Sequence, residues 1–340
     1  MSDTQTSAAS GPGRWCPAEY RYRAADLAAV TPLDAETLYV VGGLYGNLEA
    51  LDAIEAMAAR ESGPVTLVFN GDFHWFDVDA GSFARVEAAL ADHVQLRGNV
   101  ETELSGDGGD AVGCGCGYPE WIDDATVAHS NAIMRRLAAT AAGLPGVAAR
   151  LAALPMYARF RVGAVTVGIV HGDAEGLAGW GFAQERVDAA EHQQRIRKWF
   201  AQAEVDVFAS SHTCLPVALC LDDGGRQRML LNNGAAGMPN FAGDLRGVIT
   251  RVGVEPPRET SLYGARVAGV HLDALPVHYD AAAWNRDFLV NWPAGSPAHA
   301  GYFSRLTRGP GYRLVEAVRH GVDQKQKCWY GHLSARMRPA

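Results

Sequence analysis

The sequence predicts an α/β fold, a four-layer αββα sandwich in which two mixed β-sheets pack face to face and helices cover their outer faces. The first third of the chain alternates short apolar β-type runs with helical stretches, as in βαβ units. The first strands each end in a polar turn that contains glycine, which is typical of sheets whose functional residues lie beyond the strand ends. Many further β-type runs follow, and they predict a second sheet.

The first βαβ unit sets this pattern. Residues 38–42 form an apolar β-type run, and residues 65–69 form another that leads into Asp72. Between them, Asn47 is a typical helix N-cap, because its side chain can accept a backbone N–H of the first turn. The helix that follows has apolar residues at helical spacing, namely Leu48, Leu51, Ile54 and Met57.

The remaining elements are predicted from the same two periodicities. Helices are expected over 83–90, 124–141 and 185–203, and the Gly-rich stretch 106–123 is expected to be a long loop. The predicted strands are short runs of apolar and β-branched residues, at 94–96, 157–162, 165–170, 205–209, 216–221, 229–231, 248–252, 265–272 and 275–279.

Length and composition indicate a large globular core. The chain has 340 residues, 48% of them hydrophobic, and no apolar run long enough to span a bilayer. We divide it into a flexible N-terminal leader (1–35), one main domain (36–305) and a basic C-terminal tail (306–340). The leader starts with a polar stretch rich in Ser, Thr and Gly, so we expect no signal peptide.

Charge and cysteine content restrict the partners and the compartment. The formal net charge of -8 gives no general attraction for nucleic acid, and we expect no membrane partner. With six cysteines and no export signal, we expect a cytoplasmic protein whose cysteines are free thiols or metal ligands. Cys114 and Cys116 are too close in sequence for a zinc knuckle, and we interpret them as two thiols in a Gly-rich loop. The oligomeric state stays open, a homo-oligomer included.

Four predicted strands end in residues of metal-ligand type. Asp72 and Asn99 follow two early strands, His171 follows a later one, and His212 with Cys214 follows the next. A carboxylate, an amide oxygen and imidazoles together suit a divalent ion such as Mn, Fe or Zn. Any one of these residues alone is weak evidence for a metal site, but an ordered series at four strand ends is stronger.

This series resembles the calcineurin-like metallophosphoesterase family, and in particular its small bacterial phosphodiesterase branch. The likeness runs in the family's order over roughly residues 36–290. It rests on the following segments: Gly43-Leu44-Tyr45-Gly46-Asn47, Gly71-Asp72, Gly98-Asn99-Val100-Glu101, His171-Gly172, Ser211-His212-Thr213-Cys214, Asn232-Asn233-Gly234-Ala235 and Val277-His278-Tyr279-Asp280.

The resemblance implies a site for two ions of which half has changed. The family's second metal position maps onto Asp72, Asn99, His171 and His212, all of the expected kind. Its first position maps onto Asp72 together with residues that are poor or unusual ligands, Gly43, Tyr45 and Cys214. The histidine that assists the leaving group in the family corresponds to Val100, and an expected arginine corresponds to Asn240.

Three functions remain open from the sequence. The first is metal-dependent hydrolysis of a small phosphomonoester or phosphodiester, with Asp72, Asn99, His171 and His212 as catalytic metal ligands. The second is different metal chemistry at a rebuilt site that uses Cys214, Tyr45 or His74, with one or two ions. The third is a non-catalytic relative that binds a phosphorylated ligand or a partner. Asn47, Trp75 and Asn240 are the candidate substrate-binding residues.

Overall fold

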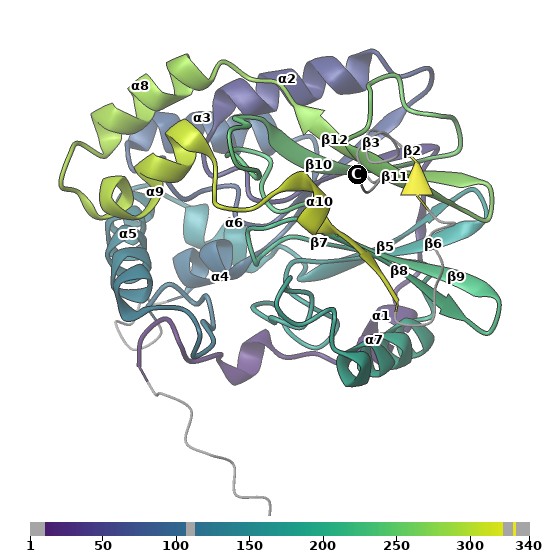
Figure 1. Cartoon of the computed structure of the whole chain (residues 1–340). Helices are drawn as coiled ribbons and strands as arrows, with labels where there is room; N and C mark the ends of the chain where they lie inside the picture. The colour runs from purple at the N-terminus through teal and green to yellow at the C-terminus, as the bar shows by residue number, and fades with distance from the viewer. Residues whose placement is uncertain (1–10, 107–112, 322–328, 331–340) are drawn as a thin grey trace, which may run out of the picture.

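A computed structural model describes residues 11–106, 113–321 and 329–330. Two seven-stranded mixed sheets pack face to face, and helices cover the outer face of each (Figure 1). The predicted fold class is therefore confirmed. Within the described ranges, no helix is both long and apolar enough to cross a membrane.

In one sheet, the first long strands of the chain lie together at one edge. Strands β2 (Thr37–Val41), β3 (Val65–Asn70) and β4 (Val94–Leu96) run parallel, and β10 (Gly247–Gly253) pairs antiparallel with β2, as in Thr250 with Val40. In spatial order the strands are β14 (Trp329–Tyr330), β11 (Tyr263–Val267), β12 (Val270–Val277), β10 (Gly247–Gly253), β2 (Thr37–Val41), β3 (Val65–Asn70) and β4 (Val94–Leu96).

The other sheet is built from the middle of the chain. Its central strands β6 (Val165–Val170), β7 (Val207–Ser210) and β9 (Arg226–Asn232) are parallel, so the carboxyl ends of β6 and β7 lie at the same edge. In spatial order the strands are β1 (Leu33–Asp34), β5 (Tyr157–Val162), β6 (Val165–Val170), β7 (Val207–Ser210), β9 (Arg226–Asn232), β8 (Val217–Asp223) and β13 (Val318–His320).

The helices begin at capping side chains in several places. Asn47, Asp79, Asp123 and Ser296 each accept a backbone N–H in the first turn of the helix that follows. The helices are η1 (Ala18–Tyr20), α1 (Ala24–Ala28), α2 (Leu48–Ala59), α3 (Ala80–Leu90), α4 (Asn99–Ser105), α5 (Asp124–Ala142), α6 (Val147–Ala152), α7 (Ala190–Ala203), α8 (Ala281–Asn291), α9 (Pro297–Arg308) and α10 (Leu314–Ala317).

Three apolar clusters hold these layers together. One lies between the sheets and contains alternate residues of facing strands, such as Val40 and Val167. A second lies under helices α2, α3 and α5, and a third lies under α1 and α7. Strand β2 is buried along its whole length, as expected for a strand covered on both faces.

Both ends of the described chain are more ordered than the sequence suggested. Residues 1–10 of the predicted leader lie outside the described residues, but Tyr20 and Leu27 are buried in the cluster under α1 and α7. In the predicted tail, β13 adds a parallel strand beside β8, and Arg319 pairs with Asp188. Residues 322–328 and 331–340 of the tail lie outside the described residues.

Candidate metal centre

The ends of four strands, two from each sheet, meet at one place. Asp72 follows β3, and Asn99 opens α4 after β4; His171 directly follows β6, and His212 follows β7. Asp72 and His212 have positive φ angles of 52° and 34°, a conformation that is uncommon for residues other than glycine. Such backbone conformations concentrate at functional sites, where the surrounding structure holds them in place.

The polar atoms of these four side chains converge. The Oδ1 atom of Asn99 lies 3.2 Å from His171 Nε2 and 3.0 Å from His212 Nδ1. His171 Nε2 lies 3.3 Å from both Asp72 Oδ1 and His212 Nδ1. Asp72, His171 and His212 thus offer three ligand atoms within 4.8 Å of one another, all on buried residues. This is a candidate Asp/His/His metal site, and the Asn99 oxygen faces the same point.

Backbone carbonyls decide which ring nitrogens face that point. His171 Nδ1 lies 2.8 Å from the carbonyl oxygen of Asn70, and His212 Nε2 lies 3.0 Å from that of Cys116. A carbonyl can only accept, so in each neutral ring this nitrogen carries the proton and the other has a free lone pair. Both lone pairs point into the cluster. A cation there would find all four ligands oriented in advance.

The protonation states agree with this arrangement. Burial, together with the nearby His171, lowers the pKa of His212 to about 3, so this ring is neutral near pH 7. Burial also lowers the pKa of His171, but the Asp72 carboxylate outweighs it and raises that pKa above its ordinary value. A positive charge is therefore favoured beside Asp72, and a bound metal ion would supply it in place of a proton.

Glu101 holds together the two loops that carry Asp72 and Asn99. Its buried carboxylate accepts hydrogen bonds from the backbone N–H groups of Asp72, at 2.8 Å, Phe73, at 3.1 Å, and Gly98, at 2.9 Å. The loops contain several backbone groups that no regular element pairs, and a carboxylate can accept more than one of them. Glu101 therefore positions the backbone on both sides of the site.

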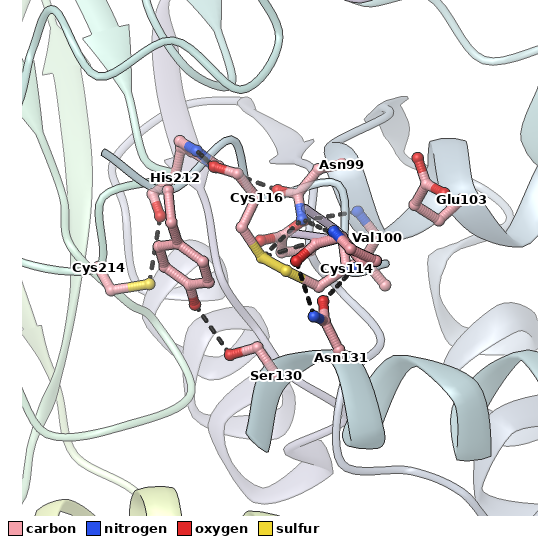
Figure 2. Close-up of a disulfide and its surroundings, with 12 residues drawn as sticks. Asn99, Val100, Glu103, Cys114, Cys116, Ser130, Asn131, His212 and Cys214 are labelled. Carbon is pink, nitrogen blue, oxygen red and sulfur yellow. Dashed lines mark hydrogen bonds between the residues drawn. A yellow bond between two sulfur atoms is a disulfide. The ribbon is translucent and has the colours of Figure 1, made fainter. Parts of the chain in front are cut away.

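The loop around Cys114 and Cys116 forms one wall of the site. The two cysteines form a disulfide, so the expectation of two free thiols is wrong. Asn99 Nδ2 donates to the Cys114 carbonyl at 2.9 Å, which turns the Asn99 oxygen towards the cluster, and the Cys116 carbonyl orients His212. Asn131 of α5 accepts the N–H of Cys114 (2.9 Å) and so fixes the loop (Figure 2). Spacing alone could not predict that these carbonyls orient two ligands.

Two neutral side chains, Tyr45 and Cys214, occupy the place beside this cluster where the resemblance implied a first metal position. The Tyr45 hydroxyl lies 3.1 Å from Cys214 Sγ, and burial raises the pKa of both groups above their ordinary values. Neither residue is therefore an anionic ligand near neutral pH. A Cβ atom on Gly43 would lie 2.8 Å from Tyr45 Cζ, so the tyrosine ring fills the space that a side chain there would need.

His74, predicted as a replacement ligand, lies elsewhere. Its Nδ1 contacts Asp77, its Nε2 lies 2.8 Å from Glu87, and the ring stacks on Phe83. Burial alone lowers the pKa of His74, but the Asp77 and Glu87 carboxylates outweigh it and raise this pKa to about 9. The ring is protonated near pH 7 and has no lone pair for a metal.

We therefore expect His74→Ala to destabilise the fold without changing the metal content. Removing the cation leaves the buried carboxylate of Asp77 and the half-buried one of Glu87 with one partner fewer, and breaking a buried pair costs about 3–5 kcal/mol. Urea denaturation would measure the loss of unfolding free energy, and elemental analysis of the folded variant would measure the metal. The matched control is His278→Ala, because His278 is exposed. Loss of metal from a folded His74→Ala protein would contradict the structural role.

A cavity of about 270 Å³ opens beside the cluster. Asp72, Asn99 and His212 contribute to its wall, and so does the predicted substrate-binding residue Trp75. Four aromatic residues make up much of the remaining wall: Tyr45, Tyr118, Trp180 and Tyr302. Size and composition fit a small ligand with an apolar part.

The other two predicted substrate-binding residues have structural roles. Asn47 caps α2 and donates to the carbonyl of Gly237 at 2.8 Å. The side chain of Asn240 is buried and bonds to the backbone of Ala235 and Met238. Both amides are therefore taken up by the backbone, and neither residue lines the cavity.

Arg305 of α9 is a cavity residue that sequence reasoning missed. It donates from Nε to the carbonyl of Pro239 at 2.9 Å and from Nη2 to that of Cys214 at 2.6 Å. These bonds hold a positive charge in the cavity wall beside the strand-end loops. The sequence contained no local signal for this role, because α9 reaches the site only through the packing of the helices.

Two solved structures are similar to this chain over most of its length. A metallophosphoesterase from Sphaerobacter thermophilus is 17% identical with a TM-score of 0.51, and the likeness covers 81% of this chain and 100% of that one. A hypothetical protein from Pyrococcus horikoshii OT3 is 16% identical with a TM-score of 0.54, over 81% of this chain and 99% of that one. No protein-family model and no curated protein matches the sequence.

Proposed function

The chain has the calcineurin-like metallophosphoesterase fold, and from this premise we propose that it is a metal-dependent phosphoester hydrolase with a single metal position. Asp72, Asn99, His171 and His212 would hold the ion. When bound, a divalent ion lowers the pKa of a water molecule towards neutrality and polarises a phosphoryl oxygen. The substrate is a small phosphorylated molecule, since the cavity of about 270 Å³ is small for a ligand pocket.

The observation that carries the proposal is the inward orientation of four lone pairs. His171 Nε2 lies 3.2–3.3 Å from ligand atoms of Asp72, Asn99 and His212, and the Asn99 oxygen lies 3.0 Å from His212 Nδ1. The carbonyls of Asn70, Cys116 and Cys114 take up the protons on the outer side of three of the side chains. Buried acceptors that face one another repel unless a cation or proton lies between them. Oxygen and imidazole ligands together favour Mn, Fe or Zn over softer ions.

A single metal position follows from the state of Tyr45 and Cys214. Burial raises the pKa of both, they contact each other, and the tyrosine ring fills the space next to Gly43. A second ion there would have to ionise two buried groups and displace a ring. Tyr45 and Cys214 instead form a neutral wall of the cavity, and Arg305 provides a positive charge for the phosphoryl group.

The proposal predicts one metal equivalent, which Cys214→Ser retains. Elemental analysis of metal-replete protein would measure the stoichiometry, and hydrolysis of bis(p-nitrophenyl) phosphate with added Mn²⁺ would measure activity. Two equivalents, one of them lost in Cys214→Ser, would support a rebuilt two-ion site instead. One bound equivalent with no hydrolysis would leave a binding protein for a phosphorylated ligand.

A further inference from the structure

We propose that the substrate is an aryl phosphoester, one whose leaving group is a phenol held by the aromatic wall of the cavity. This inference rests on the proposed hydrolytic function. Two independent features carry it: none of the four ligand side chains bonds to another side chain that could donate a proton to the leaving group, and the cavity next to the cluster is lined by aromatic rings.

The first feature is the chemistry of the groups around the ligands. Val100 lies beside Asp72 in space and lines the cavity. Its backbone nitrogen lies 3.3 Å from Asp72 Oδ1, and its side chain has no proton to donate. In the described part of the chain, the hydrogen bonds of the four ligand side chains go to one another, to the backbone and to the disulfide sulfur of Cys116. None of them reaches a side chain outside the cluster that has a transferable proton.

Without such a donor, the leaving group must depart as its own anion. Water adds its oxygen to phosphorus and loses a proton to solvent, while the P–O bond to the leaving group breaks and its electron pair leaves with that oxygen. A phenol has a pKa of about 10, as in tyrosine, whereas the pKa of an alkyl alcohol is much higher, close to that of water. General acids typically contribute about 10²–10⁴-fold to such steps, so alkyl esters would lose most from the absence of one.

The second feature is the position of the aromatic wall. The Trp180 ring centroid lies 5.6 Å from that of His212, and Trp180 Nε1 donates to the Cys116 carbonyl at 2.9 Å. The same carbonyl orients His212, so the indole and the ligand are fixed relative to each other. The Tyr118 ring centroid lies 5.8 Å from that of Trp180. The aryl group of a phosphoester whose phosphorus lies at the cluster would therefore contact these aromatic rings.

Other titratable groups line the same cavity without reaching the cluster. Among the described residues these include Tyr45, Tyr118, His129, Glu185, Cys214 and Tyr302, and none of their side chains bonds to a side chain of the four ligands. Tyr45 and Cys214 bond to each other, and Cys214 also bonds to the backbone carbonyl of His212. Tyr118 bonds to Ser130 at 2.9 Å. His129 is the one whose imidazole could act as an acid for a longer substrate, so it needs its own variant.

The test compares leaving groups on the metal-loaded full-length chain. The substrates are p-nitrophenyl, phenyl and ethyl esters of phosphate, as monoesters and as diesters. We expect kcat/KM to fall steeply as the leaving-group pKa rises, with ethyl esters at least about 100-fold slower than phenyl esters. In Val100→His, the new imidazole should raise ethyl ester hydrolysis at least about tenfold and change p-nitrophenyl ester hydrolysis little. His129→Gln should leave the dependence on leaving-group pKa unchanged.

A binding measurement tests the aromatic wall separately. Phenylphosphonate and methylphosphonate cannot be hydrolysed at this bond, and calorimetry would give their Kd values on the metal-loaded chain. We expect phenylphosphonate to bind at least about tenfold more tightly, and Trp180→Leu to remove most of that preference. The matched control is Trp121→Leu, because Trp121 packs against Trp180 but does not line the cavity.

The outcomes separate the two proposals. Ethyl and phenyl esters hydrolysed at similar rates would overturn the aryl preference and leave the phosphoesterase in place. If His129→Gln loses the hydrolysis of ethyl esters, His129 is the acid, and the aryl preference is overturned as well. Equal binding of the two phosphonates would also overturn the aryl preference. No hydrolysis of any ester by protein with bound metal would overturn the hydrolytic function itself. If the buried Val100→His variant does not fold, the leaving-group series on the wild-type chain still tests the aryl preference.

Discussion

His171→Ala is expected to lose the bound metal and to lower phosphoester hydrolysis by about 10²–10³-fold or more. The substitution removes a ring nitrogen that lies within 3.3 Å of Asp72, Asn99 and His212. It also leaves the carbonyl of Asn70 without its buried donor. The remaining three ligands would still face one another, but without the side chain at their centre.

Elemental analysis and thermal unfolding with and without added Mn²⁺ would check this result. Metal that binds only the folded state raises its stability, so the wild-type melting temperature should rise with added metal and that of His171→Ala should not. His278→Ala, at an exposed histidine, should behave like the wild type. A His171→Ala protein that keeps one equivalent and full activity would show that the four side chains do not form the working site.

Reduction of the Cys114–Cys116 disulfide is expected to weaken metal binding by about 10–100-fold, the usual cost of disturbing groups that orient metal ligands. The carbonyls of these two cysteines accept hydrogen bonds from Asn99 and His212. Opening the disulfide frees the loop to move both carbonyls. Asn99 and His212 would then lose the contacts that hold their ligand atoms towards the cluster.

Calorimetric titration with Mn²⁺, before and after treatment with a phosphine reductant, would measure this change. In a Cys114→Ser/Cys116→Ser double variant, the affinity should already be low and should not respond to the reductant. Cys214→Ser should respond as the wild type does, because Cys214 is a free thiol outside the disulfide. An affinity that is the same in oxidised and reduced wild type would mean that Asn131 and the rest of the loop fix the carbonyls alone.

Much of the fold followed from local patterns in the chain. The helix predicted at 124–141 corresponds to α5, Asp124–Ala142, because Asp123 caps it and its apolar face is regular. The helix predicted at 185–203 begins only at Ala190 in α7. Tyr20 lies in the predicted flexible leader, but it is buried in the cluster under α1 and α7, and α1 packs against α7.

The sequence by itself determined the α/β class and put residues of metal-ligand type at the ends of four strands, since both depend on periodicity and residue chemistry along the chain. Only the tertiary structure decided which atoms face inward. The carbonyls of Asn70 and Cys116, remote in sequence from the rings they orient, select the tautomers of His171 and His212. Two carboxylates likewise keep His74 protonated and away from the site. The direction of a lone pair depends on a hydrogen-bond partner, and in this site most partners come from distant parts of the chain.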